Sequence, residues 1–341
     1  MSATKATATR VRYPPLIAAV TTALIGTLIG IALIGLTPIP GVADPGVVVL
    51  VAIPLVRIVL DIAAVVTIGL CLLSVLLGYD RPKQTELIAR RARRAAVAAA
   101  LVWSVSALVA LLLQTAEFQA AADAVGPGDV WDYVVGVGAG KALLIVAVLA
   151  AAHAALGVLA VRHGEKVPAE ARVGLGLFAL LPLPVTGHAS NWDYHDYTMI
   201  SMELHVMSAV AWTGGLGAMA VLLASNRALL AHALPRFSKL ATICILVSAC
   251  TGLFNGIVEI QLNPTMSFWE GTFETPYGLL FLGKLLCLGA IAVVGARMRW
   301  RLLPAITAQR HTAFVTWAAL ELTIMGLAFG FAVMLTRAPV A

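Results

Sequence analysis

The chain has 341 residues, of which 60% are hydrophobic and 12% are charged. Soluble globular domains carry about 25% charged residues, so this composition excludes an ordinary soluble protein and predicts an all-α, polytopic bundle within a lipid bilayer. At roughly 20 apolar residues per span, the length allows about eight to ten transmembrane helices. The net charge of +6 does not indicate nucleic-acid binding, because the location of the basic residues explains it.

Nine apolar segments follow one another along the chain. Residues 1–13 are polar and basic, and we expect a mobile cytoplasmic tail there. No small-residue cleavage site follows the first apolar segment, which predicts a retained helix rather than a signal peptide. In the fifth segment, Pro182 and Pro184 should kink or stop the helix. The segments are 14–36, 47–77, 95–117, 135–161, 172–187, 197–224, 237–260, 276–296 and 311–336.

The loops between these segments alternate in charge. Most of the 23 Lys and Arg residues lie in every second loop, beginning with the N-terminal tail, and the other loops are acidic. Lys and Arg favour the cytoplasmic side of a membrane, so we expect about nine transmembrane helices with a cytoplasmic N-terminus and an external C-terminus. We predict N-terminal transmembrane helices over 14–180 and a second transmembrane domain over 181–341.

A few charged residues fall inside the apolar segments. Arg57 and Asp61 are four residues apart on one predicted helix and can neutralise each other. We expect Lys284 to pair with Glu203 or Glu321, because an ion pair relieves part of the cost of desolvation. An alternative is that these two glutamates relay protons or hold cations transiently.

Histidine and methionine gather between Gly187 and Gly215, in an otherwise Ala-, Leu- and Val-rich chain. Polar or small residues recur on one helical face there, which predicts that His205 points into the bundle rather than into lipid. Met202 precedes His205 by three residues and is its neighbour on that face. The residues of the face are Ser201, His205, Ser208, Trp212 and Gly215.

An imidazole inside a membrane is costly and indicates function by default. Thioether and imidazole together suit Cu(I), whereas imidazole with carboxylate or water suits Cu(II) or Zn. We predict that copper is collected outside near His188, His195 and Met199, and is bound by His188 and His205 with support from Met202. The alternatives are core packing for the methionines, a solvated loop for His195, a helix cap for His188 and a structural hydrogen bond for His205.

The remaining soft ligands are less informative. His153 lies in the inner half of the fourth segment, where it is either an exit site for an ion or a core histidine. All four cysteines lie inside apolar segments, and we expect them to be small buried hydrophobes. These cysteines are Cys71, Cys244, Cys250 and Cys287.

An ordered set of motifs in residues 185–341 resembles the copper resistance protein D (CopD) family of bacterial inner-membrane proteins. The motifs are Gly187-His188, Leu204-His205, Trp212-Thr213-Gly214-Gly215, Arg236-Phe237-Ser238, Thr251-Gly252, Thr275-Pro276-Tyr277-Gly278 with Lys284, and Glu321 with the terminal LTRAP. The resemblance implies copper passage across, or delivery into, the cytoplasmic membrane. Some related actinobacterial proteins join this module to one that is similar to a cytochrome oxidase assembly factor (CtaG type).

The leading hypothesis is therefore a copper transporter or copper-delivery protein of the bacterial plasma membrane, and not an enzyme. No P-loop is present, so ATP use is not expected. Its partners would be copper ions, the lipid bilayer, and an external copper chaperone or oxidase assembly factor. One alternative is a membrane b-type cytochrome with His188 and His205 as axial haem ligands, and another is an assembly module that presents copper without transporting it.

Overall fold

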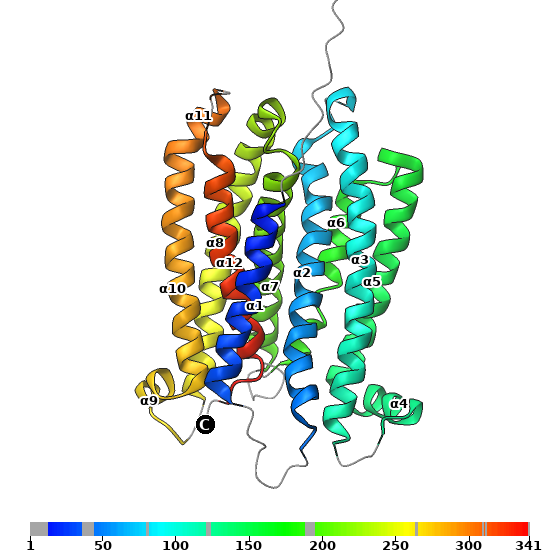
Figure 1. Ribbon diagram of the computed structural model, residues 1–341, viewed down its shortest axis with the longest axis vertical. Coiled ribbons are helices and arrows are strands. Elements are labelled where there is room, and N and C mark those ends of the chain that lie inside the picture. The colour runs from blue at the N-terminus through cyan, green and yellow to red at the C-terminus, as the bar shows by residue number, and fades with distance from the viewer. Residues whose placement is uncertain are drawn as a thin grey trace, which may run out of the picture.

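A computed structural model describes residues 13–35, 44–79, 82–120, 124–187, 195–262, 265–308, 310 and 312–339. This part of the chain is all-helical, and nine of its helical stretches are long and apolar enough to cross a membrane. The long helices run roughly parallel to one axis of the molecule (Figure 1). They are α1 (Pro14–Ile34), α2 (Val47–Leu77), α3 (Pro82–Phe118), α5 (Gly138–His163), α7 (His195–Leu222), α8 (Arg227–Gln261), α10 (Pro276–Arg297) and α12 (Phe314–Leu335). The ninth stretch, Ala169–Thr186, consists of the shorter helix α6 (Ala169–Phe178) and the turns that follow it.

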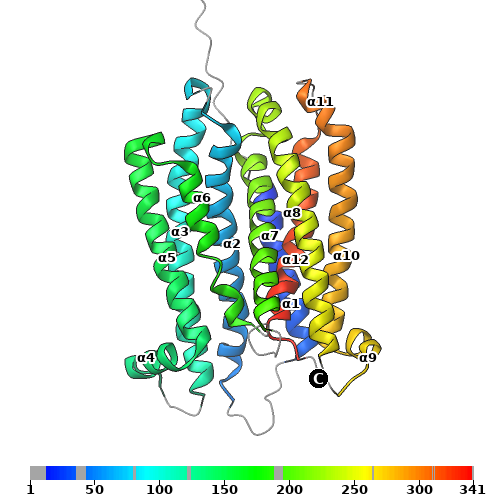
Figure 2. The ribbon, with the colours of Figure 1, turned by 180° about the vertical axis from the view of Figure 1, so that it is seen from behind.

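The helices form two neighbouring groups, which are seen from opposite sides in Figures 1 and 2. The first group contains α2, α3, α5 and α6, and the second contains α7, α8, α10 and α12. Helix α1 packs chiefly against α12, so the first and last helices lie side by side in the second group. The predicted division at residues 180 and 181 instead assigns α1 to the N-terminal helices, and that division stays a prediction.

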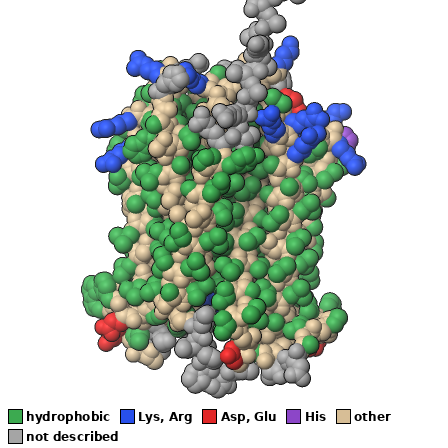
Figure 3. Space-filling model, viewed as in Figure 1, with side chains coloured by type: hydrophobic (Ala, Val, Ile, Leu, Met, Phe, Trp, Pro, Cys, Tyr) green, Lys and Arg blue, Asp and Glu red, His purple; other side chains and the backbone are tan. Residues whose placement is uncertain are grey.

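Charge separates along the bundle axis (Figure 3). Lys and Arg side chains gather at the upper end in this view, and the visible carboxylates lie mainly at the lower end, with an apolar band between them. We call these the basic end and the acidic end. Basic residues gather in the first part of α3, for example Arg90 and Arg94, and Arg297 is the last residue of α10. The separation agrees with the alternating loop charges.

The fifth apolar segment is interrupted, as its prolines predict. Helix α6 ends at Phe178, and a short 3-10 turn, η2 (Leu183–Thr186), follows it. Proline lacks the N–H that an α-helix needs and its ring clashes with the preceding turn. Leu183 and Pro184 are buried, so this irregular backbone is covered by protein, as a membrane environment requires.

Two short helices at the acidic end were not expected from hydropathy. They are α4 (Pro127–Gly136) and α9 (Phe268–Phe273), and both lie across the direction of the long helices (Figure 1). Ser267 caps α9 and exchanges hydrogen bonds with Glu270, which hold the pKa of that carboxyl below its usual range. The remaining short elements are η1 (Gly164–Lys166), the π-helical turn η4 (Met298–Leu302) and α11 (Leu303–Thr307).

The two groups of helices touch most closely where α2 crosses α7. Gly69 of α2 faces Gly214 of α7, and a Cβ atom on either residue would meet the backbone of the other helix. Small residues allow helices in a membrane to approach closely. The glycines at this crossing therefore let the backbones of α2 and α7 come into contact.

Candidate metal site in the central cavity

A cavity of about 250 Å³ lies between the two groups of helices. It extends along α7 from Thr198, near the acidic end, to Trp212. These residues are about 21 Å apart at 1.5 Å per helical residue, so the cavity enters the apolar interior. Helices α2, α8, α10 and α12 and the turn η2 complete its walls. The walls are mostly apolar, with a few polar side chains.

His205 is the imidazole of this cavity. Its Nδ1 atom lies 3.1 Å from the Ser248 carbonyl oxygen and 3.2 Å from the Thr251 hydroxyl oxygen on α8. The Thr251 hydroxyl donates its own proton to Val247, so both neighbours of Nδ1 act as acceptors. Nδ1 therefore carries the proton, and Nε2 has a free lone pair. Metal-binding histidines are oriented in this way, by donation from the other ring nitrogen to a carbonyl.

The predicted polar face of α7 is confirmed as a single surface, which contacts α8. Ser201 donates to the Thr251 carbonyl, and the Ser208 hydroxyl lies 2.7 Å from that of Ser248. One carbon atom and both nitrogens of the His205 ring lie within 4.0 Å of where a Cβ on Gly252 would be. The glycine thus leaves room for the imidazole against α8.

Met202 also lines the cavity, one turn from His205. Its sulfur is 4.0 Å from the Asn255 side-chain nitrogen, and the Asn255 Oδ1 atom is buried without a hydrogen-bond partner among the described residues. Glu259 is buried and lines the same cavity. Asn255 and Glu259 were not predicted as part of the site. They follow Ser248 by seven and eleven residues on an apolar helix, and this spacing puts all three on one helical face.

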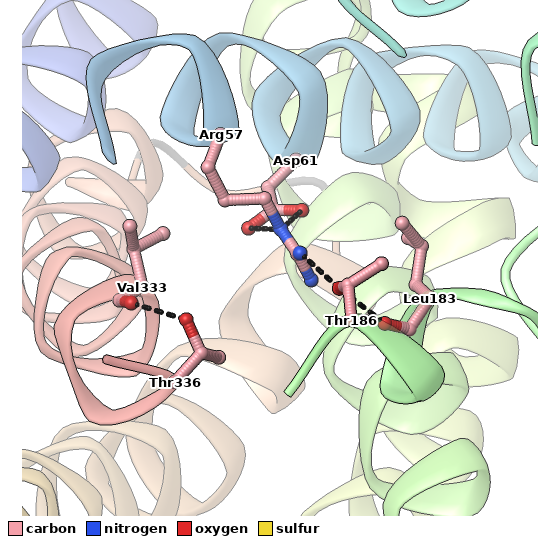
Figure 4. A network of polar contacts seen from close by, with 6 residues as sticks. All are labelled: Arg57, Asp61, Leu183, Thr186, Val333 and Thr336. Carbon is pink, nitrogen blue, oxygen red and sulfur yellow. Dashed lines mark hydrogen bonds and ion pairs between the residues drawn. The ribbon is translucent and has the colours of Figure 1, made fainter. Parts of the chain in front are cut away.

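Arg57 and Asp61 line the opposite wall (Figure 4). The guanidinium Nε atom donates to Asp61 at 3.2 Å, and Nη1 donates to the Thr186 hydroxyl at 2.7 Å. Thr186 donates in turn to the Leu183 carbonyl. The predicted ion pair within α2 is therefore confirmed. It also ties α2 to the turn η2, so the pair fixes the irregular segment that forms this wall.

Lys284 of α10 lines the same cavity as His205. The expected ion pair with Glu203 or Glu321 does not form between these described residues, and this prediction is wrong. Glu203 is half-buried on α7 away from the cavity lining. Glu321 is buried and within hydrogen-bonding reach of the Trp212 indole, so its partner comes from α7 rather than α10.

The remaining predicted ligands are only partly described. His188 lies outside the described residues, so its pairing with His205 stays a prediction. His195 is the first residue of α7, and nothing is described of its side chain. Met199 is half-buried but does not line the cavity. Within the described residues, no group of three or more His, Cys, Asp and Glu side chains is close enough to hold a metal.

Comparisons with known proteins agree with the resemblance found in the motifs. Residues 42–195 match the N-terminal domain of copper resistance protein D-like proteins, and residues 231–335 match copper resistance protein D. The segment that carries His205 lies between the two matches. Copper resistance protein D of Pseudomonas syringae pv. tomato is 29% identical over 170 residues, which are 47% of this chain and 53% of that protein.

The chain thus spans about half the length of the curated relative it matches. No solved structure matches it. The two matched domains occur in order along one chain, and nine described helices are able to span a membrane. The protein therefore belongs to the copper resistance protein D (CopD) family of multi-pass proteins in the bacterial inner membrane.

Proposed function

We propose that this protein transports copper across the bacterial plasma membrane, or delivers copper within it, through a site at His205. The single observation that carries the proposal is an oriented imidazole beside a thioether in a cavity within the apolar band. Thioether and imidazole ligands favour Cu(I). We expect a role in copper homeostasis or cuproenzyme assembly, without enzymatic activity.

The proposed route begins at the acidic end. Copper is collected near His188, His195 and Met199, and passes to His205 and Met202 inside the cavity. The oxygen atoms of Asn255 and Glu259 partly offset the repulsion that Lys284 exerts on a cation. The cavity reaches Trp212, beyond which Glu321 is the next buried carboxylate. An external copper chaperone or an oxidase assembly factor is the proposed partner at the ends of this route.

The test compares the wild type with His205→Ala in two measurements: copper bound by the purified protein and copper accumulated by cells. His163→Ala is the matched control, because His163 is exposed at the basic end and, among the described residues, its ring bonds the Leu159 carbonyl of its own helix. We expect His205→Ala to bind less copper than the wild type and to lower accumulation, while His163→Ala behaves as the wild type. Normal binding and accumulation in His205→Ala would show that the proposed site is wrong.

Two further measurements separate the alternatives. Copper uptake into proteoliposomes distinguishes transport from delivery without transport, because only a transporter moves the ion into the vesicle lumen. The visible absorption spectrum of the purified protein tests the cytochrome alternative, since bound haem gives a strong Soret band. We expect copper uptake and no Soret band.

A further inference from the structure

A second cluster of buried polar side chains lies toward the basic end, between α2, α5 and α6. The sulfur of Cys71 is 3.8 Å from His153 Nε2 and 3.8 Å from a guanidinium nitrogen of Arg172. The exposed fractions of these residues are 0%, 1% and 3%, respectively. None of the three lines the central cavity, so the cluster is separate from the site at His205.

The hydrogen bonds of this cluster are incomplete. His153 Nε2 lies 3.1 Å from the Arg172 carbonyl oxygen, whereas Nδ1 is buried without a partner among the described residues. Arg172 Nε also has no hydrogen-bond partner among these residues. If Nε2 carries the proton, the Nδ1 lone pair is unsatisfied; if Nδ1 carries it, the Nε2 lone pair faces a carbonyl. An unsatisfied buried polar group destabilises the fold by about 1–3 kcal/mol. Residues that serve only packing are rarely left in this state.

The spacing of the two donor atoms suits a metal ion. With bonds of about 2.3 Å to sulfur and about 2.0 Å to nitrogen, as for zinc, a bond angle of about 120° puts the donors about 3.7 Å apart. The sulfur and Nε2 are 3.8 Å apart, which is close to this separation, and an ion bound between them would replace the contact of Nε2 with the Arg172 carbonyl oxygen. Thiolate ligands select soft ions such as Cu(I).

We propose that Cys71 and His153 form a second Cu(I) site in the basic half of the protein. Cu(I) binds the Cys71 sulfur in place of the thiol proton, which is released, and binds His153 through Nε2, with no change in the oxidation state of the metal. The guanidinium of Arg172 donates to the sulfur, and a nearby cation of this kind favours loss of the thiol proton.

The position of this pair suits an ion that has left the central cavity. Cys71 and the cavity residue Trp212 belong to the same hydrophobic core of buried residues. On the other side, Arg172 lines a crevice at the basic end together with Ser74, Tyr79 and Glu165. Cys71 is about 9 Å from the end of α2 at Leu77, at 1.5 Å per residue. The role of this site as a step on the copper route rests on the proposed function. Its ability to bind Cu(I) is argued from the geometry of Cys71 and His153 alone.

The test titrates the purified full-length protein with Cu(I) without oxygen, in competition with the chelator bathocuproine disulfonate. We expect Cys71→Ser and His153→Gln each to bind about one Cu(I) fewer per chain than the wild type. Cys244→Ser is the matched control, because Cys244 is a buried cysteine of the same hydrophobic core as Cys71 but is not one of the proposed ligands. Cys244→Ser should bind as much Cu(I) as the wild type.

The near-ultraviolet spectrum of the Cu(I)-loaded wild type provides a second readout that needs no buried substitution. A thiolate bound to Cu(I) adds an absorption band that a methionine site does not. We expect this band in the wild type and in His205→Ala, and its loss in Cys71→Ser. Absence of the band from the wild type, or full Cu(I) binding by Cys71→Ser, would overturn the second site. A different result would contradict the proposed function, namely normal copper accumulation in cells that carry His205→Ala.

Discussion

The orientation of the His205 ring depends on two atoms of the neighbouring helix α8. One is the backbone carbonyl of Ser248 and the other is the side-chain hydroxyl of Thr251. Outer contacts of this kind fix the tautomer of a metal-binding histidine, and their loss typically lowers metal affinity 10- to 100-fold. Of the two, only the hydroxyl is removed by a side-chain substitution.

Thr251→Val is therefore expected to weaken Cu(I) binding at His205 by about 10-fold, because valine keeps the shape of threonine but accepts no hydrogen bond. The measurement is a competition titration of Cu(I) against a chelator. Thr242→Val is the control, since Thr242 lies on the same helix at the basic end and bonds Ser238 and Arg299. Equal affinity in Thr251→Val and Thr242→Val would mean that the ring is held by Ser248 alone.

The ion pair of Arg57 and Asp61 allows a prediction about stability. The exposed fractions of the two side chains are 16% and 18%, so each charge relies on the other. Asp61→Asn removes one charge and leaves the other uncompensated, which costs about 3 kcal/mol in a buried pair. We expect a clearly lower melting temperature in detergent for Asp61→Asn, and recovery in Arg57→Met combined with Asp61→Leu. A double variant as unstable as Asp61→Asn would contradict this explanation.

Residues on a single helix were the easiest to predict from the sequence. The spacing of Ser201, His205 and Ser208 identified the inner face of α7, because it depends only on helical periodicity. Asn255 and Glu259 were missed because their importance depends on which helix packs against α7. The ion pair of Lys284 was predicted wrongly for a similar reason: its outcome depends on how α7, α10 and α12 are arranged, which periodicity does not determine.

At the scale of the helices, hydropathy located all nine spans but not their full lengths. Helix α3 begins at Pro82, thirteen residues before the predicted apolar segment at 95, and α8 begins at Arg227 rather than 237. Hydropathy reports only the part of a helix that lies in an apolar environment. The Arg- and Ala-rich stretch before residue 95 continues the helix past the apolar band because both residues are strong helix formers.

The crossing of α2 and α7 gives a prediction with a matched control on the same helix. A Cβ atom on Gly214 would lie 2.9 Å from the Gly69 Cα atom, whereas a Cβ on Gly217 would have its nearest neighbour at 3.9 Å. We expect Gly214→Ala to push the helices apart and to lower the melting temperature and the yield of folded protein. Gly217→Ala should be tolerated. Equal melting temperatures for the two variants would show that the crossing accommodates a methyl group.

At the scale of the whole molecule, the distribution of charge is the feature that orients the protein. The basic end and the acidic end are separated by the apolar band (Figure 3), and the cavity at His205 begins near the acidic end. The direction of the proposed copper movement therefore depends on which end faces the cytoplasm. An excess of Lys and Arg marks the cytoplasmic side, which predicts that the cavity is reached from outside the cell and that the Cys71 cluster lies toward the cytoplasm.

Labelling of single cysteines in intact cells tests this orientation. Glu274→Cys and Glu165→Cys are a matched pair, because each replaces an exposed glutamate, at the acidic end and at the basic end respectively. Cys250 is exposed and is first replaced by alanine, whereas the other three cysteines are buried. We expect a membrane-impermeant maleimide to label Glu274→Cys in intact cells and Glu165→Cys only after permeabilisation. The opposite labelling pattern would show that the protein has the inverted orientation in the membrane. Copper that enters the cavity would then come from the cytoplasm.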